Sequence, residues 1–319
     1  MVNFEPSVTL NNGQKMPMLG IGTWQSKPNE VRDAVDYAID VGYRSIDTAY
    51  VYGNEAEIGE TLTKKINEGK IKREDIFITT KLWSTYHHPD RVADGIKKSL
   101  ERLQTNYIDL YLIHNPAHFK FIDESNNFPK DANDKVMYEK VDIVQTWKEL
   151  EKAVDQGLLK AIGLSNFNKR QIQQILDNSR IKPANLQVEC HAYFMQKPLF
   201  EFCKQNNITF TAYGPLGSPQ RPSVRPEDPI LLKEPKLAEI AQRHNKTPAQ
   251  ILNRFLIERG RVTIPKSVHR ERIKENFEIL DFKFSDDDLK ELDALDKNLR
   301  YFLFEFIQDS PDYPFADPY

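Results

Sequence analysis

Short apolar segments alternate with longer amphipathic segments through most of this 319-residue chain. The alternation starts after residues 8–17, where two short runs flank Asn12-Gly13, a dipeptide that favours the tight turn of a β-hairpin. The apolar segments after this hairpin predict eight strands, at residues 19–23, 45–46, 76–80, 108–113, 161–164, 186–188, 208–211 and 262–264. The amphipathic segments predict helices at residues 29–41, 54–70, 89–103, 141–156, 169–177, 198–205, 235–244 and 248–259.

Eight strands that alternate with helices favour an α/β protein built as one closed (β/α)8 TIM barrel with parallel strands. We therefore expect a single domain over residues 1–319, with an open doubly wound sheet as the alternative. Three long segments interrupt the alternation, at residues 115–140, 214–234 and 297–319. The first two follow strands directly, so we expect them over the carboxyl-terminal rim, where long loops are usually functional. The third is rich in aromatic residues, which predicts that it docks onto an apolar surface.

Composition narrows the class of protein. A net charge of −3 with 39% apolar and 29% charged residues is typical of a globular protein with no general attraction to nucleic acid or anionic membranes. Asn3 and Glu5 interrupt the apolar character of the start, and no run approaches the roughly 20 apolar residues of a membrane span. Two cysteines are too few for a disulfide framework, and the scattered histidines predict no metal site. We expect a monomeric, cytoplasmic protein.

Titratable side chains follow three of the early strands. Asp47, Lys81 and His114 each come at the end of a strand, and Tyr52 follows Asp47 by five residues. Because the carboxyl ends of parallel strands meet at one rim, we expect the four side chains to lie close together. A phenol with a pKa of about 10 is protonated at neutral pH and can donate to an alkoxide that forms from a carbonyl.

In this interpretation, Lys81 makes the phenolate of Tyr52 easier to form, Asp47 pairs with Lys81, and His114 orients the substrate oxygen. Taken singly, each residue has an ordinary alternative: a packed tyrosine, a solvated lysine, a helix-capping aspartate or a histidine that is simply hydrogen-bonded. Their joint placement favours a catalytic site.

Five motifs resemble the signature of the aldo-keto reductase superfamily, in the same order along the chain. They are DTAYVYGNE at residues 47–55, KLW at 81–83, YLIH at 111–114, GLSNF at 163–167 and IPKS at 264–267. The sequence is most similar to the branch of aldose and aldehyde reductases, and its tail resembles insect members. By contrast, Gly20-Ile21-Gly22 lacks the third glycine of a Rossmann fingerprint.

The resemblance implies that NADPH transfers a hydride to the carbonyl carbon of a small-molecule substrate while Tyr52 protonates the oxygen. It assigns Tyr52, Lys81, Asp47 and His114 to catalysis. Lys266 and Arg272 would surround the 2′-phosphate of the cofactor and favour NADPH over NADH. The full set that the resemblance assigns to the cofactor is Thr23, Trp24, Ser165, Asn166, Gln187, Tyr213, Leu216, Ser218, Lys266, Ser267, Val268, Arg272, Glu275 and Asn276. The substrate would meet Trp24, Trp83, His114 and Asn115.

The sequence departs from this family pattern at Asn115, where close aldose reductase relatives often carry tryptophan. A small amide at this position could open the pocket to a larger or more polar substrate. One alternative is therefore a reductase of a bulky apolar ketone such as a ketosteroid. Another is a binding module that senses the nicotinamide cofactor, as in the potassium channel β-subunits.

Overall fold

The computed structural model describes residues 6–317, so Asn3 and Glu5 of the sequence analysis lie outside the described residues. Eight parallel strands form a single sheet in which each strand pairs with its neighbour in sequence. The strands are β3 (Ile21–Gly22), β4 (Ser45–Asp47), β5 (Phe77–Leu82), β6 (Ile108–Ile113), β7 (Leu159–Ser165), β8 (Asn185–Glu189), β9 (Thr209–Tyr213) and β10 (Val262–Thr263). Sequential order is that of a (β/α)8 barrel, whereas a doubly wound sheet reverses its order at a switch point.

The first and last strands close the sheet into a barrel. Parallel bridges join Leu19 to Thr263 and Gly22 to Lys266, and the amide of Gly20 donates to the carbonyl oxygen of Thr263 at 2.9 Å. A Cβ atom at position 22 would lie 2.7 Å from the carbonyl oxygen of Ile264, so this close approach requires glycine. The predicted barrel is therefore confirmed, and the glycine pair marks its seam.

The predicted hairpin, β1 (Ser7–Thr9) and β2 (Lys15–Pro17), covers the amino-terminal end of the barrel. The side-chain amides of Asn11 and Asn12, in its turn, donate to the carbonyl oxygens of Pro183 and Lys160, which lie just before β8 and at the start of β7. Met16 is buried and packs with barrel residues in an apolar cluster. This end is thus filled, and the opposite end is left for a ligand.

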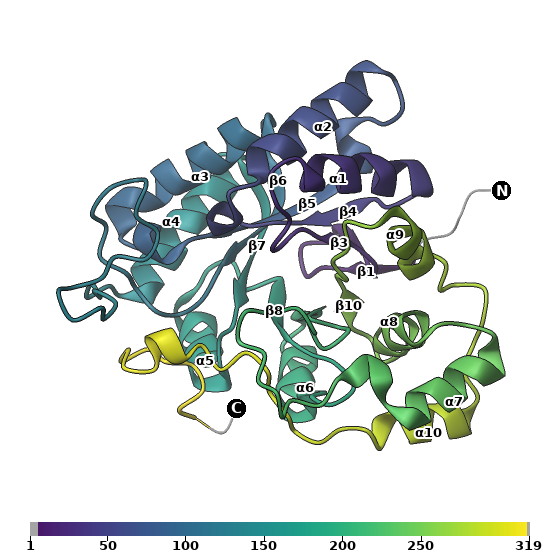
Figure 1. The fold of residues 1–319 in the computed structure, drawn as a ribbon. Coiled ribbons are helices and arrows are strands. Elements are labelled where there is room, and N and C mark those ends of the chain that lie inside the picture. The colour runs from purple at the N-terminus through teal and green to yellow at the C-terminus, as the bar shows by residue number, and fades with distance from the viewer. Residues whose placement is uncertain (1–5, 318–319) are drawn as a thin grey trace.

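Helices surround the barrel, as Figure 1 shows. They are α1 (Glu30–Val41), α2 (Glu55–Asn67), α3 (Pro89–Leu103), α4 (Ile143–Asp155), α5 (Lys169–Asn178), α6 (Lys197–Gln205), α7 (Pro235–His244), α8 (Pro248–Glu258), α9 (Arg270–Phe277) and α10 (Asp286–Asp293). The eight predicted helices are present with small shifts at their ends, and α9 and α10 are additional. The capping box of Ser285 and Asp288 at the start of α10 is the sequence signal that could have revealed that helix.

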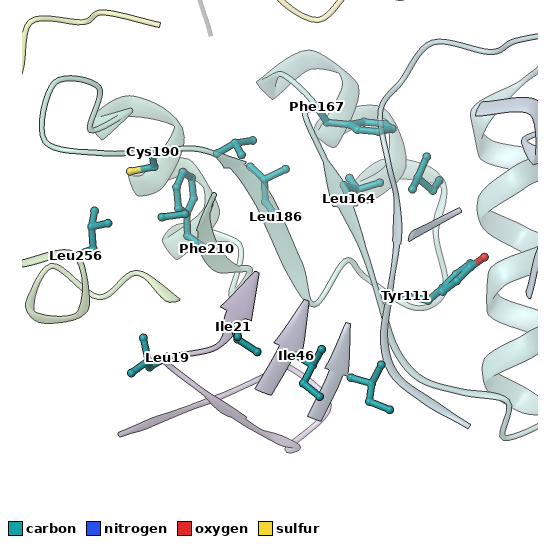
Figure 2. Close-up of a cluster of buried hydrophobic side chains, with 14 of the residues drawn as sticks. Leu19, Ile21, Ile46, Tyr111, Leu164, Phe167, Leu186, Cys190, Phe210 and Leu256 are labelled. Carbon is teal, nitrogen blue, oxygen red and sulfur yellow. The ribbon is translucent and has the colours of Figure 1, made fainter. Parts of the chain in front are cut away.

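Side chains alternate between the two faces of each strand, because the period of a strand is two residues. The outward residues pack against the helices in one large apolar cluster, from which Figure 2 labels Ile46, Tyr111, Leu164, Leu186 and Phe210. The residues that come next along the strands therefore point into the barrel. The inward positions nearest the carboxyl ends are Asp47, Lys81, His114, Ser165, Gln187, Glu189 and Tyr213.

In Figure 1 the aromatic tail leaves α10, runs along the lower edge of the view and ends near α5. There the carboxylate of Asp317 accepts hydrogen bonds from Asn168 and Arg170, and Gln171 donates to the carbonyl oxygen of Asp312. None of the helices within residues 6–317 combines the length and the apolar character that a membrane span requires.

Candidate active site

A cavity of about 1280 Å³ opens at the carboxyl-terminal end of the barrel. Residues of all three long segments line it, including Phe128, Leu216 and Phe302. The prediction that residues 115–140 and 214–234 lie over this rim is confirmed, and part of the tail lies there as well. Every residue that the sequence analysis assigned to catalysis, cofactor or substrate also lines the cavity, with the exception of Lys81. Lys81 is fully buried and reaches the site through its contacts with other residues.

A buried ion pair forms the floor of the site. The ammonium of Lys81 lies 2.7 Å from Oδ1 of Asp47 and donates to the carbonyl oxygen of Thr48 at 2.8 Å. Oδ2 of Asp47 accepts a hydrogen bond of 2.6 Å from the amide nitrogen of Gln187. Both oxygens of the carboxylate are therefore bonded to neighbouring side chains, which is the condition under which a buried charge pair is tolerated. The predicted pairing of Asp47 with Lys81 is present, and Gln187 joins it.

Tyr52 lies on a short 3₁₀ helix, η1 (Tyr50–Tyr52), which ends at Gly53 with a left-handed φ of 69°. Asn54 fixes the end of this turn: its amide donates to the carbonyl oxygen of Thr23 at 2.9 Å, and its Oδ1 accepts from the hydroxyl of Thr48 at 2.7 Å. The turn places the Tyr52 ring with its centroid 5.1 Å from the Lys81 ammonium. Phenol and ammonium are thus neighbours, as the sequence predicted.

Burial determines the protonation state of these groups. It raises the pKa of Tyr52 well above the ordinary value of 10, and the charge of Asp47 acts in the same direction. Lys81 was expected to make the phenolate easier to form, whereas the net shift in pKa is upward because burial removes the phenolate from water. Burial also lowers the pKa of Lys81, which Asp47 opposes. At neutral pH Tyr52 is therefore a protonated phenol.

His114 directly follows β6 and packs between two aromatic rings. Its ring centroid lies 5.7 Å from that of Tyr52 and 5.1 Å from that of Trp83, both in edge arrangements. Burial, with the charge of Lys81 as a second cause, lowers the pKa of His114 well below its ordinary 6.5. The imidazole is neutral at pH 7, so it can donate a hydrogen bond to a substrate oxygen without serving as the acid.

Asn115 is buried, and both ends of its side chain are hydrogen-bonded within the loop. Its amide nitrogen donates to the hydroxyl of Ser84 at 2.8 Å, and its oxygen accepts from the backbone amide of Ala117 at 2.9 Å. These atoms hold the loop in place and are not left free for a substrate. The asparagine that replaces tryptophan therefore adds little polarity to the cavity.

Asn166, which directly follows β7, and Tyr213, at the end of β9, form a hydrogen-bonded group that lines the cavity. Asn166 has a left-handed φ of 63°, and its amide donates to the carbonyl oxygen of His114 at 2.9 Å. The hydroxyl of Tyr213 donates to Oδ1 of Asn166 at 2.8 Å. This network fixes the Tyr213 ring on the cavity wall beside Ser165, where a flat ring can stack on it.

Positive charge gathers where the barrel closes. Lys266 and Arg272 line this part of the cavity, and the Lys266 ammonium donates to the carbonyl oxygen of Gln25 at 3.1 Å. Neither cation forms an ion pair with a carboxylate of residues 6–317. Two cations that lack a counter-ion fit a phosphate group, because charge-assisted hydrogen bonds would satisfy both. Glu275 and Asn276 also line this end and are hydrogen-bonded to Thr247 and Asn253 of α8 and its cap.

Sequence reasoning did not single out several cavity residues. They are Gln25, Val51, Phe128, Lys130, Val136, Arg221, Lys233, Thr247 and Ile307. The aromatic residues of the tail were expected at an apolar surface, and Phe302, Phe304 and Phe306 among them line the cavity. The other residues lie on loops, or beside them, whose course no periodic pattern predicts.

A (β/α)8 barrel with a tyrosine, lysine, aspartate and histidine gathered at its carboxyl-terminal rim is the architecture of a reductase. The chain matches the Aldo/keto reductase family over residues 17–297 and belongs to it. It is similar to aldo-keto reductase family 1 member A1 of Xenopus tropicalis, at 47% identity over 98% of each chain. The rat protein of the same name is also 47% identical, over 98% of this chain and 99% of its own.

A solved structure of similar fold is that of the aldose reductase from Schistosoma japonicum. It matches with a TM-score of 0.92 and 47% identity, covering 98% of this chain and all of that one. The chain is thus an oxidoreductase of the aldo-keto reductase family, which generally uses a nicotinamide cofactor. An enzyme of this class agrees better with these relatives than a pure binding module does.

Proposed function

We propose that this protein reduces aldehydes and ketones to alcohols with NADPH, and that Tyr52 supplies the proton. One observation carries the proposal above the others. The phenol of Tyr52 lies on the cavity wall beside the buried pair of Lys81 and Asp47. The same cavity extends to Lys266 and Arg272, which form no ion pair with a carboxylate of residues 6–317.

Each polar residue has a distinct part in the proposed reaction. His114, neutral at pH 7, donates a hydrogen bond that orients the carbonyl oxygen. The cofactor, when bound, supplies the hydride that adds to the carbonyl carbon. As charge develops on the oxygen, Tyr52 transfers its proton there and becomes a phenolate. The Lys81 ammonium beside the ring stabilises that phenolate, so its influence falls on the transition state.

The preference for NADPH rests on Lys266 and Arg272. A 2′-phosphate would provide the counter-charge that these two residues lack within the described chain. Ser267, which lines the same part of the cavity, offers a hydroxyl beside them. NADH has no phosphate at this position, so it would leave both cations unpaired.

A bulky apolar ketone is a second candidate substrate. Phe128, Phe302, Phe304 and Phe306 all line the outer cavity, and the polar atoms of Asn115 are already bonded within the protein. Such a wall would bury apolar carbon atoms of a large substrate and gain the usual hydrophobic free energy.

The test is an assay of NADPH oxidation at 340 nm with propanal, glyceraldehyde, 4-nitrobenzaldehyde and a ketosteroid, and with NADH in parallel. We expect turnover with aldehydes and a preference for NADPH. Cofactor binding is measured separately by quenching of tryptophan fluorescence. Tight binding of NADPH without turnover of any carbonyl would contradict the proposal and favour the binding-module alternative.

A further inference from the structure

Glu189, the last residue of β8, is a fully buried carboxylate for which the reaction has no use. Its two oxygens accept the backbone amides of two consecutive tail residues, Tyr301 at 2.7 Å and Phe302 at 3.0 Å. Nε2 of His191 lies 2.9 Å from Oε1 of the same carboxylate. A buried carboxylate that receives two backbone donors binds the chain tightly, because charge-assisted hydrogen bonds are about twice as strong as neutral ones.

The segment that follows β8 continues this attachment. The amides of Lys297 and Leu299 both donate to the carbonyl oxygen of Tyr193, at 3.1 and 3.0 Å. The guanidinium of Arg300 lies 4.5 Å from the ring centroid of Phe194 and 3.6 Å from that of Phe315. Residues 189–194 therefore dock residues 297–302 of the tail, and Glu189 holds the end of the docked segment nearest the cavity.

The residue at that end belongs to the cavity wall. Phe302 lines the cavity, and its ring centroid lies 5.7 Å from that of Trp24 and 5.5 Å from that of Tyr213. Glu189 holds the backbone amide of this residue directly. The carboxylate therefore holds the backbone from which the Phe302 ring extends to the cavity wall.

We propose that Glu189 is a positioning residue for substrate selectivity, acting through Phe302; this rests on the proposed function. The two inward side chains at the end of β8 then position different parts of the site. Gln187 bonds to the catalytic carboxylate of Asp47, and Glu189, two residues further, bonds to the substrate wall. The affinity for a substrate large enough to touch Phe302 depends on this attachment. The affinity for a small substrate that reaches only Tyr52 and His114 does not.

The experiment compares Glu189→Gln with the wild type in two measurements. Hydrogen exchange of the Phe302 amide should become about tenfold faster, because one carboxylate acceptor is replaced by an amide donor. The KM for 4-nitrobenzaldehyde should rise about tenfold while kcat with propanal stays within about twofold, since one anchoring hydrogen bond is lost from the wall alone. Asp317→Asn is the matched control, because the Asp317 carboxylate also accepts two hydrogen bonds that attach the tail, but it holds the tail against α5, away from the cavity.

A double variant with Phe302→Ala decides whether the effect passes through that ring. Phe302→Ala alone should reproduce the loss of selectivity, and Glu189→Gln should add little to it. An unchanged exchange rate at Phe302, an equal loss of kcat for both substrates, or full additivity of the two substitutions would each overturn the proposal.

If the protein does not reduce carbonyls, the wild type shows no NADPH oxidation while the exchange result still reports on the attachment, so the two failures are distinguishable. Should Glu189→Gln fail to fold, the selectivity of Phe302→Ala and the exchange of Glu189→Asp carry the test.

Discussion

The two sides of the cavity are built in different ways. On the inner side, Asp47, Lys81 and Gln187 come from three strands, are buried, and are joined by hydrogen bonds of 2.6 and 2.7 Å. On the outer side, Phe128 and Phe306 come from two long loops, remain 45% and 47% exposed, and touch with ring centroids 6.0 Å apart. Proton transfer needs positions fixed to a fraction of an ångström, which strands and buried hydrogen bonds provide. Selection among substrates tolerates an adaptable wall, and loops can change it without disturbing the chemistry.

This division predicts a large effect for a change on the inner side. Tyr52→Phe removes the proposed proton donor without altering the packing of the ring, so kcat for carbonyl reduction should fall by about 10²–10⁴-fold, the usual contribution of general acid catalysis. NADPH affinity, measured by fluorescence titration, should change little, because the phenol is remote from Lys266 and Arg272 in the proposed arrangement. Near-normal kcat in this variant would show that another group is the acid.

The inner side could also be predicted from sequence to a large extent, and the outer side could not. Strand periodicity together with the positions of Asp47, Lys81 and His114 was enough to place three side chains at one rim. The motif resemblance supplied Gln187, yet the bond from its amide to Asp47 required coordinates, because both residues point inward from strands far apart in sequence. The rise in the pKa of Tyr52 was missed because burial depends on the loops that cover it. No local pattern indicates that the amides of residues 301–302 meet Glu189, more than 100 residues earlier.

A second prediction concerns the fixed positive charges at the seam of the barrel. Lys266→Met should weaken NADPH binding by about 1.5–3 kcal/mol, the usual contribution of a hydrogen bond to a charged group, and NADH binding much less. Fluorescence titration with both cofactors measures the difference. Lys274→Met, which alters an exposed cation on α9 near Glu278, is the control and should leave both affinities unchanged. Equal losses for the two cofactors would mean that Lys266 does not recognise the 2′-phosphate.

A third prediction tests the base of the outer wall, where His118 of the long loop meets His87 with their Nδ1 atoms 3.0 Å apart. Burial lowers the pKa of His118 to about 4, although the charge of Asp142 acts in the opposite direction. In the unfolded chain His118 takes up a proton near pH 6.5, whereas in the folded protein it does so only near pH 4. The contribution of neutral His118 to the free energy of unfolding is therefore complete above pH 6.5 and is lost as the pH falls toward 4. Burial also lowers the pKa of His87 well below its ordinary value, and the carboxylate of Asp312 lies 3.9 Å from Nε2 of His118.

Between pH 7 and pH 4.5 the wild type should therefore lose about 2 kcal/mol more unfolding free energy than His118→Gln, which cannot bind the proton. Urea unfolding at the two pH values measures this difference, and any constant cost of the substitution cancels. Parallel losses in the two proteins would show that His118 does not titrate between its folded and unfolded values.

The smallest effect is expected at the outermost ring. Phe128 is half-exposed, and its ring centroid lies 5.1 Å from that of Trp83 and 6.0 Å from that of Phe306. Trp83 is also held by a hydrogen bond of 2.7 Å from its indole to the carbonyl oxygen of Asn127. Phe128→Ala should therefore cost only about 1 kcal/mol of unfolding free energy, well below the 3–5 kcal/mol of a core phenylalanine. The KM for 4-nitrobenzaldehyde should rise a few-fold, while kcat with propanal stays at the wild-type level because Trp83 and His114 keep their positions. A loss of kcat with propanal would mean that the loop positions the catalytic side chains as well, and the separation of a fixed inner side from an adaptable outer side would not hold.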